Sequence, residues 1–143
     1  MTNFAYDVFV SYRQVEPDLS WVRERLVPRL QVDGLRVCVD YLSFRLGAPL
    51  VHEMERAVET SRYTLAVLTP GYLASTFTDL EVVLARHLGL ELRQRRLVAV
   101  RLDRAAEPPL HVAAHLWWEI DDTTGFETVA ARLAIELRRD PGD

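Results

Sequence analysis

The sequence predicts an α/β domain, because apolar runs of strand length alternate with segments that have the spacing of amphipathic helices. The runs are apolar on both faces, which is typical of a parallel sheet covered by helices on both sides. The chain has 143 residues, of which 49% are hydrophobic and 27% charged, and this is the usual size and composition of one globular domain. We therefore expect a single domain over residues 1–143, with a folded core over residues 6–139.

Strands and helices are expected to follow one another in turn. The strands are predicted at residues 6–12, 35–40, 63–69, 97–102 and 116–120. The helices are predicted where apolar residues recur every three or four positions, at residues 19–30, 51–58, 80–88 and 126–137. Gly34 is suited to end the first helix and Pro49 to begin the second. Pro28 lies inside the first helix, where it removes a backbone donor, so we expect a bend there.

Charge and cysteine content exclude several classes of protein. The net charge is −4 and no dense run of Lys and Arg occurs, which argues against nucleic acid or an anionic membrane as the main partner. The short cluster of Arg93, Arg95 and Arg96 is expected to be a solvated helix end or loop. The single cysteine, Cys38, has no partner for an internal disulfide and is expected to be a core thiol. Because the chain has neither an apolar span of about 20 residues nor a signal peptide, we expect it in the reducing cytoplasm.

The first strand ends abruptly in the polar side chains of Ser11, Tyr12 and Arg13. In open α/β sheets ligands bind outside the carboxyl ends of the strands, so these side chains stand where a site would form. The Arg13 guanidinium suits a phosphate, a carboxylate or a stacked ring. A surface ion pair with Glu16 or Asp18 is the alternative, and the sequence leaves both open.

The segment between the second strand and its helix, residues 40–49, is unusually long and apolar. It exceeds the usual connection of about 2 to 6 residues, and long loops are often functional. Leu42, Phe44 and Leu46 are too apolar for an idle surface loop. They are expected to pack on the domain, line a ligand pocket or dock into another subunit, and these alternatives stay open.

Glu81 follows the third strand and its turn, so it lies early in a helix above the same edge of the sheet. A carboxylate held there suits ribose hydroxyls, or the positive charge that develops at an anomeric carbon. Phe77, four residues earlier, shares its helical face if the helix already includes it. Thr78-x-x-Glu81 also matches a capping box, in which Glu81 only satisfies backbone N–H groups. Spacing alone does not decide between these interpretations.

Other catalytic signatures do not appear in the sequence. His111 and His115 have helical spacing, but no third ligand accompanies them, so no metal site is expected. The glycines form no phosphate-binding fingerprint, and no serine falls in a nucleophile elbow. A phosphoacceptor domain of this fold needs an Asp at the end of the third strand, where this chain has Thr69 and Pro70.

Four motifs, in this order, resemble those of the TIR (Toll/interleukin-1 receptor) domain family. Residues 6–12 resemble the first strand of that family, and residues 39–47 resemble its BB loop. Residues 65–70 resemble its third strand with the Ser/Thr-Pro turn. Residues 75–81 resemble the segment that carries the catalytic Glu of NAD-cleaving members. The likeness covers nearly the whole chain.

The resemblance implies a flavodoxin-like parallel sheet of five strands, in the order 2-1-3-4-5, with helices on both faces. Some TIR domains are adaptors that assemble through their helices and BB loops, and others cleave NAD+ to nicotinamide plus ADP-ribose or a cyclic isomer. We expect the second function, in a prokaryotic-type effector of immunity or signalling, such as antiphage defence. NAD+ is then the substrate rather than a cofactor, activity requires self-association, and the chain is part of a longer protein with a sensor or oligomerisation domain.

The resemblance also assigns roles to residues. Glu81 is implied to be the catalytic carboxylate. The residues implied to bind the substrate are Ser11, Tyr12, Arg13, Asp40, Phe44, Arg45 and Phe77. Two of these depart from the family pattern, since Phe77 stands where NAD-cleaving members usually have Trp, and Arg45 stands where some have an acid.

Overall fold

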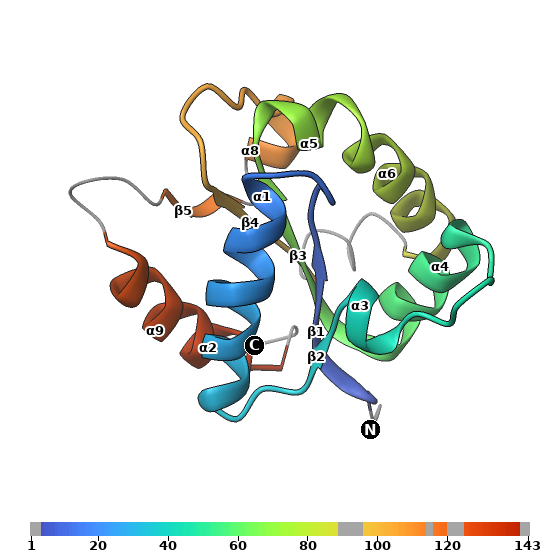
Figure 1. The fold of residues 1–143 in the computed structure, drawn as a ribbon, viewed down its shortest axis with the longest axis horizontal. Coiled ribbons are helices and arrows are strands. Elements are labelled where there is room, and N and C mark those ends of the chain that lie inside the picture. The colour runs from blue at the N-terminus through green and yellow to red at the C-terminus, as the bar shows by residue number, and fades with distance from the viewer. Residues whose placement is uncertain (1–3, 89–95, 114–115, 120–124, 141–143) are drawn as a thin grey trace.

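The sheet has five strands, all parallel, in the order β2-β1-β3-β4-β5 (Figure 1). The structure is a computed structural model that describes residues 4–88, 96–113, 116–119 and 125–140. The strands are β1 (Tyr6–Ser11), β2 (Val37–Cys38), β3 (Ser61–Leu68), β4 (Leu97–Arg101) and β5 (Leu116–Glu119). The predicted fold class and strand order are therefore confirmed.

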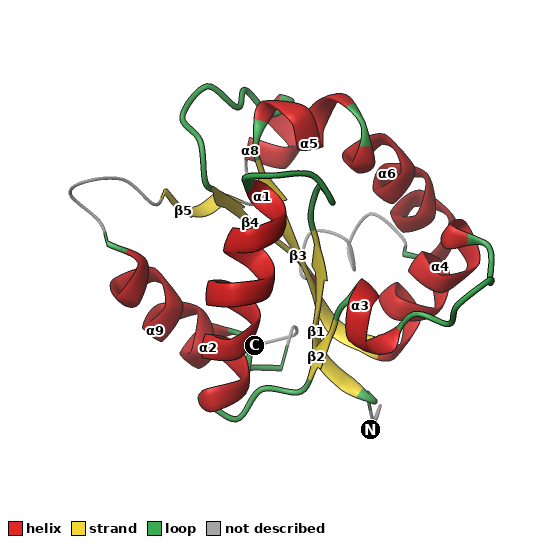
Figure 2. Ribbon diagram, in the orientation of Figure 1, coloured by secondary structure: helices red, strands yellow, loops and turns green. Residues whose placement is uncertain are grey.

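Helices cover both faces of the sheet, as Figure 2 shows. One face is covered by α2 and α9, and the other by α4 and α6. The helices are α1 (Asp18–Ser20), η1 (Trp21–Leu26), α2 (Val27–Val32), α3 (Asp40–Ser43), α4 (Leu50–Thr60), α5 (Pro70–Ala74), α6 (Thr76–His87), α8 (Leu110–Ala113) and α9 (Phe126–Glu136).

Alternate residues of β1 enter two separate cores. Val8 and Val10 lie in the core beneath α2 and α9, whereas Phe9 lies in the core beneath α4 and α6. Cys38 belongs to the second core. Burial raises the pKa of its thiol, as expected for a core cysteine.

The first helix changes its hydrogen-bonding pattern just before Pro28. It consists of α1, the π-helical η1 and α2, and the Val27 N–H bonds to the carbonyl of Val22, five residues back. In a regular α-helix the Pro28 ring would crowd the carbonyl four residues earlier. The irregularity expected at Pro28 is therefore a wider helical turn that precedes it. Gly34, with φ of 88°, follows the helix and turns the chain toward β2.

The strand before the long connecting segment is shorter than predicted. Only Val37 and Cys38 form β2, and the chain then enters α3 at Asp40. The start of the predicted loop is thus one turn of helix, and Asp40 is a helix residue rather than the last residue of a strand.

A short helix, α5, occupies the turn after β3, where no helix was predicted. Pro70 begins it, and the hydroxyl of Thr69 accepts a hydrogen bond of 3.2 Å from the backbone N–H of Tyr72. Both features are known signals of a helix start. The prediction relied on the spacing of apolar residues and therefore did not include this helix. After α5, the next helix α6 begins at Thr76, earlier than predicted.

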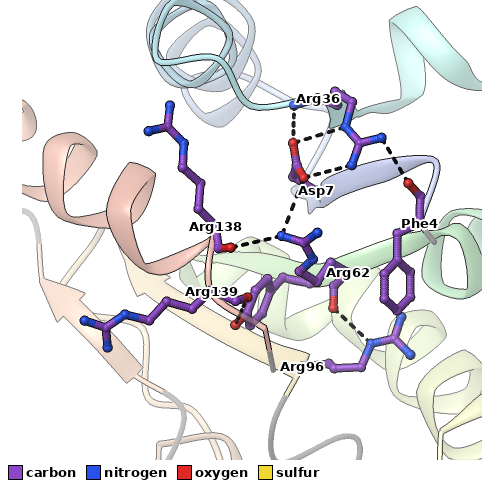
Figure 3. Close-up of polar contacts among 8 residues, drawn as sticks. Phe4, Asp7, Arg36, Arg62, Arg96, Arg138 and Arg139 are labelled. Atoms are coloured by element: carbon purple, nitrogen blue, oxygen red, sulfur yellow. Dashed lines mark hydrogen bonds and ion pairs between the residues drawn. The ribbon is translucent and has the colours of Figure 1, made fainter. Parts of the chain in front are cut away.

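Arg96 is buried, so its prediction as part of a solvated cluster is wrong. Its guanidinium donates hydrogen bonds to the carbonyls of Val58, Ser61 and Arg62, the last of which is drawn in Figure 3. These carbonyls accept hydrogen bonds from the guanidinium donors that burial removes from water. A cation can therefore lie buried at the start of an apolar strand. The other two arginines of the cluster lie outside the described residues.

Candidate functional site

A cavity of about 220 Å³ opens at the carboxyl end of β1, between the segment that follows β2 and the start of α6. This is the edge at which ligands bind in open α/β sheets. Its apolar walls include Phe9, Phe44, Leu50 and Met54. Its polar lining includes Ser11, Tyr12, Gln14, Asp40, Ser75, Thr76 and Asp79.

Four of the residues predicted to bind substrate meet at this cavity, namely Ser11, Tyr12, Asp40 and Phe44. Ser11 and Tyr12 follow one another at the end of β1, and each is only 3% exposed. The hydroxyl of Tyr72, from α5, donates a hydrogen bond of 2.9 Å to Ser11 Oγ. The end of β1 and the segment after β2 therefore converge on one pocket.

Asp40 is held in a network that fixes the start of α3. Its carboxylate accepts hydrogen bonds from Tyr12 Oη at 2.7 Å, Gln14 Nε2 at 2.8 Å and Arg23 Nη2 at 3.1 Å. The Arg23 Nε also donates to the Tyr12 hydroxyl at 2.8 Å. Burial, followed by the hydrogen bond to Asp40, raises the pKa of Tyr12 and keeps it a neutral donor. The charge of Asp40 is thus paired with Arg23.

The apolar residues of the connecting segment point in different directions. Phe44 packs against the domain with its ring centroid 5.9 Å from that of Phe9, and it lines the cavity. Leu42 and Leu46 are instead 56% and 103% exposed. Arg45 is also exposed and does not line the cavity. Of the three apolar candidates in this segment, Phe44 alone therefore both packs on the domain and lines the pocket.

Arg13 is not among the residues that line the cavity, although its neighbours Tyr12 and Gln14 are, and it lies against Gly71 of α5. The approach is so close that a Cβ added to Gly71 would overlap the guanidinium. The alternative of an ion pair with Glu16 or Asp18 is wrong, because Glu16 bonds within the following helical turn and Asp18 bonds to Thr69. Within the described parts of the chain, the guanidinium has no carboxylate partner.

Phe77 and Glu81 are not part of the cavity lining. Phe77 is 3% exposed and packs in the core, with its ring centroid 5.8 Å from that of Tyr72. The Glu81 side chain is 37% exposed, and its Oε2 lies 3.0 Å from Nε2 of His111 on α8. The expected common pocket of ring and carboxylate is therefore not formed in this arrangement.

The capping-box interpretation of Thr78 and Glu81 is wrong. The helix α6 begins at Thr76 with Ser75 as its N-cap, so Thr78 already lies inside the helix. The Glu81 carboxylate contacts His111 rather than the backbone at the helix start. Its position is thus set by contact between two helices and not by helix capping.

Sequence reasoning missed Asp79, the α6 carboxylate that does line the cavity. Asp79 is exposed and makes no hydrogen bond or ion pair with any described residue. Thr76, three residues earlier, lies on the same face of the helix and also lines the cavity. Glu81, two residues later, falls on another face. Had the helix been predicted to begin at Thr76, Thr76 and Asp79 would have been placed together on one helical face.

Comparison with known proteins decides the family. A family model described as "TIR domain" matches residues 8–134. The chain belongs to the TIR domain family. The relatives of this TIR domain include Toll-like receptor 6 of Bos taurus, 28% identical over 98 residues, or 68% of the chain and 12% of the receptor. Toll-like receptor 13 of Mus musculus is 36% identical over 85 residues, or 57% of the chain and 8% of the receptor. The TIR domain therefore spans only a small part of these relatives.

Solved structures are similar to this TIR domain over nearly its full length. The TIR domain of the Toll-related receptor TRR-2 from Hydra magnipapillata has a TM-score of 0.75 at 21% identity, and the match covers 94% of this chain and all (100%) of that one. A metazoan TIR-STING receptor from C. gigas has a TM-score of 0.73 at 20% identity, covering 97% of this chain and 41% of that one. At such identities the likeness establishes the fold. None of the helices in the described parts of this TIR domain is long and apolar enough to span a membrane.

Proposed function

We propose that this TIR domain cleaves NAD+ between nicotinamide and ribose. The observation that carries the proposal is the convergence of Ser11, Tyr12, Asp40 and Phe44 on one cavity. An apolar and aromatic lining with a few fixed polar groups is typical of small-molecule sites. The cavity volume of about 220 Å³ is below the usual range for a whole drug-sized ligand, about 300 to 1,000 Å³, so it suits one ring of a dinucleotide.

In this proposal the nicotinamide ring occupies the cavity beside Phe44, and the rest of the dinucleotide leaves it past Ser11. Arg13 meets the diphosphate, because its guanidinium has no carboxylate partner among the described residues and suits bidentate contact with phosphate oxygens. The ribose lies at the mouth of the cavity, near Ser75 and Thr76, which line it at the start of α6. Burial raises the pKa of Tyr72, whose hydroxyl bonds to Ser11 at the cavity.

The reaction breaks the bond between C1′ of the ribose and the ring nitrogen of nicotinamide. Both electrons of the bond go to the nitrogen, so a cationic ring leaves as neutral nicotinamide and needs no proton from the protein. Positive charge is left on C1′ and the ring oxygen of the ribose, where a nearby carboxylate stabilises it. Addition of water at C1′, with loss of its proton, gives ADP-ribose, and addition of an adenine nitrogen gives a cyclic isomer. We assign the stabilising role to Glu81.

Glu81 must leave His111 to act on the ribose. The two side chains are 37% and 59% exposed. Exposed ion pairs contribute only about 0 to 1 kcal/mol, so a change of side-chain rotamer releases Glu81 at small cost. Once released, the Glu81 side chain would turn from α8 toward the ribose at the mouth of the cavity.

Self-association is part of the proposal, because the segment after β2 exposes apolar side chains beside the site. Leu46 is 103% exposed and Leu42 is 56% exposed. Contiguous exposed apolar surface is typical of protein contacts. We propose that this segment and the helices contact a second copy and complete its pocket. The chain would work in the cytoplasm as the effector part of a longer protein of prokaryotic-type immunity or signalling.

Release of nicotinamide from NAD+, followed over a series of protein concentrations with and without a crowding agent, tests the proposal. We expect release that rises more steeply than concentration and falls by about 100-fold in Glu81→Gln. The matched control is Glu24→Gln, which removes one exposed carboxylate on η1. Release that survives Glu81→Gln refutes the role of Glu81, and the absence of release under all conditions refutes the proposed function.

A TIR–TIR interaction module without enzymatic activity is the second candidate. The exposed leucines favour it, together with Leu50 at 50% and Val51 at 40% exposure at the start of α4. The curated relatives that match are receptors by name. This candidate predicts association that increases with concentration and is lost in Leu46→Glu, while wild type releases no nicotinamide. Sedimentation velocity beside the nicotinamide assay separates the two functions.

A further inference from the structure

We infer that Asp79 makes the cavity selective for a positively charged aromatic ring over a neutral ring of the same shape. This inference deepens the proposed function and rests on it for the identity of the ring. NAD+ carries a cationic nicotinamide ring, whereas the reduced dinucleotide and free nicotinamide carry neutral ones. Asp79 would therefore determine which redox form of the dinucleotide enters the site.

The charged side chains that line the cavity differ in their partners. Among the described residues that line it, Asp40 and Asp79 are the charged ones. Asp40 is paired with Arg23 and accepts two further hydrogen bonds, from Tyr12 and Gln14. Asp79 makes no hydrogen bond or ion pair with any described residue. The uncompensated charge at the cavity is therefore that of Asp79.

The cavity walls include two aromatic rings. Phe9 and Phe44 lie with their ring centroids 5.9 Å apart, and both line the cavity together with the apolar side chain of Met54. Aromatic faces attract cations, and they also pack against a planar ring whether it is cationic or neutral. The walls therefore explain why a flat ring binds, and the Asp79 carboxylate adds an attraction that only the cationic ring receives.

Ser11 supplies a hydrogen-bond donor at the cavity. The Tyr72 hydroxyl donates to Ser11 Oγ, so the Ser11 hydroxyl keeps its own hydrogen for another acceptor. Ser11 lines the cavity, and a carboxamide oxygen on the ring would accept that hydrogen. This contact is equally available to cationic and neutral nicotinamides. The Ser11 hydroxyl thus recognises the carboxamide, and Asp79 recognises the charge.

Asp79 and Glu81 have separate roles, although they are only two positions apart on α6. Asp79 lines the cavity, whereas Glu81 contacts His111 on α8. Asp79 is a binding residue for the ring, and Glu81 acts at the ribose.

Binding of 1-methylnicotinamide and nicotinamide to the full chain, each titrated by NMR or calorimetry, tests the inference. The two probes differ by a methyl group and one positive charge, and neither has a glycosidic bond to cleave. We expect wild type to bind the cation about fivefold more tightly than the neutral probe, since a close pair of a cation and an exposed carboxylate interacts by about 1 kcal/mol in a water-like dielectric, which is roughly that factor. The preference should vanish in Asp79→Asn and remain in Asp79→Glu.

Glu24→Gln is the matched control, because it removes the same charge from an exposed position of η1, on the other face of the sheet. This variant should show the same preference for the cationic probe as wild type. Equal binding of both probes by wild type, a preference that survives Asp79→Asn, or no binding of either probe overturns the inference. The outcome is independent of catalysis. If NAD+ is not cleaved but the preference follows Asp79, the proposed enzymatic function fails and the ring-binding role stands. If NAD+ is cleaved and the preference does not follow Asp79, only the role of Asp79 fails.

Discussion

Arg36 donates three hydrogen bonds to the carboxylate of Asp7, from its backbone N–H at 2.7 Å and from its guanidinium Nε at 3.4 Å and Nη2 at 3.1 Å (Figure 3). Asp7 lies in β1, and Arg36 immediately precedes β2. The guanidinium of Arg62, in β3, lies 3.8 Å from the same carboxylate. One buried acid therefore joins three neighbouring strands at the end of the sheet opposite the cavity.

The ionisation of Asp7 should make stability depend on pH. Burial alone would raise the pKa of Asp7, but the hydrogen bonds from Arg36 outweigh it and hold the pKa below its ordinary value. A lowered folded-state pKa stabilises the fold above the unfolded-state pKa of about 3.9, and this contribution is lost as the pH falls through the folded-state value. We expect Asp7→Asn to lower the free energy of unfolding by about 2 kcal/mol at pH 7, and by less below about pH 4. Urea titrations at several pH values measure the difference.

Other carboxylates also titrate in this range, so the quantity to compare is the difference between variant and wild type at each pH. The exposed-site variant Glu24→Gln should stay within about 0.5 kcal/mol of wild type. A difference for Asp7→Asn that does not change with pH would contradict the ionisation of Asp7 as its cause.

Arg96 should not tolerate replacement by lysine. Its guanidinium reaches the carbonyls of Val58, Ser61 and Arg62 at once, and burial lowers its pKa. A lysine ammonium is a compact charge at the end of a flexible stem, so it cannot donate hydrogen bonds in the planar arrangement of the guanidinium. We expect Arg96→Lys to cost about 2 kcal/mol of unfolding free energy, measured by chemical denaturation.

The matched variant for this test is Arg86→Lys, because the Arg86 side chain is 60% exposed and contacts a surface glutamate. Its effect should be within about 0.5 kcal/mol. Equal denaturation midpoints for the two lysine variants would show that the carbonyl contacts of Arg96 contribute little.

How much of this molecule the sequence predicts depends on the kind of signal. The apolar runs predict the sheet, because burial of both faces leaves a continuous pattern that is local in the sequence. The polar end of β1 predicts one wall of the cavity for a similar reason, as Ser11 and Tyr12 show. Asp79 was missed because the predicted helix began after it. An exposed acid cannot be assigned to a helical face until the helix is known to include it. Glu81 and Arg96 depend on contacts with segments distant in sequence, which local patterns do not encode.

Gly71→Ala should weaken NAD+ binding through Arg13. A Cβ at position 71 would overlap the guanidinium, so Arg13 must move. Because Gly71 lies in α5, alanine suits its local backbone at least as well, and the variant should fold normally. We expect KM for NAD+ to rise about tenfold with little change in kcat, as for the loss of a contact that is equal in the ground and transition states. Steady-state kinetics over a range of NAD+ concentrations measure both constants.

Arg13→Ala provides the control for this mechanism. If Gly71→Ala acts only by displacing Arg13, the two changes should have similar effects, and the double variant should be no worse than either one. Additive losses would mean that Gly71→Ala damages the site by another route.

His111→Ala should speed NAD+ cleavage by releasing Glu81. The His111 Nε2 lies 3.0 Å from Glu81 Oε2, and this contact is on the flank of α6 that faces away from the ring cavity. Removal of the imidazole leaves the carboxylate free to adopt the rotamer that approaches the ribose, and an exposed pair of this kind is worth about 0.2 to 1 kcal/mol. We therefore expect kcat to rise by roughly 1.4-fold to fivefold, which is that energy expressed as a rate. His52→Ala, which removes an exposed histidine from α4, should leave kcat unchanged. A fall in kcat for His111→Ala would mean instead that the imidazole holds Glu81 in its working position, and the contact would then belong to the active arrangement.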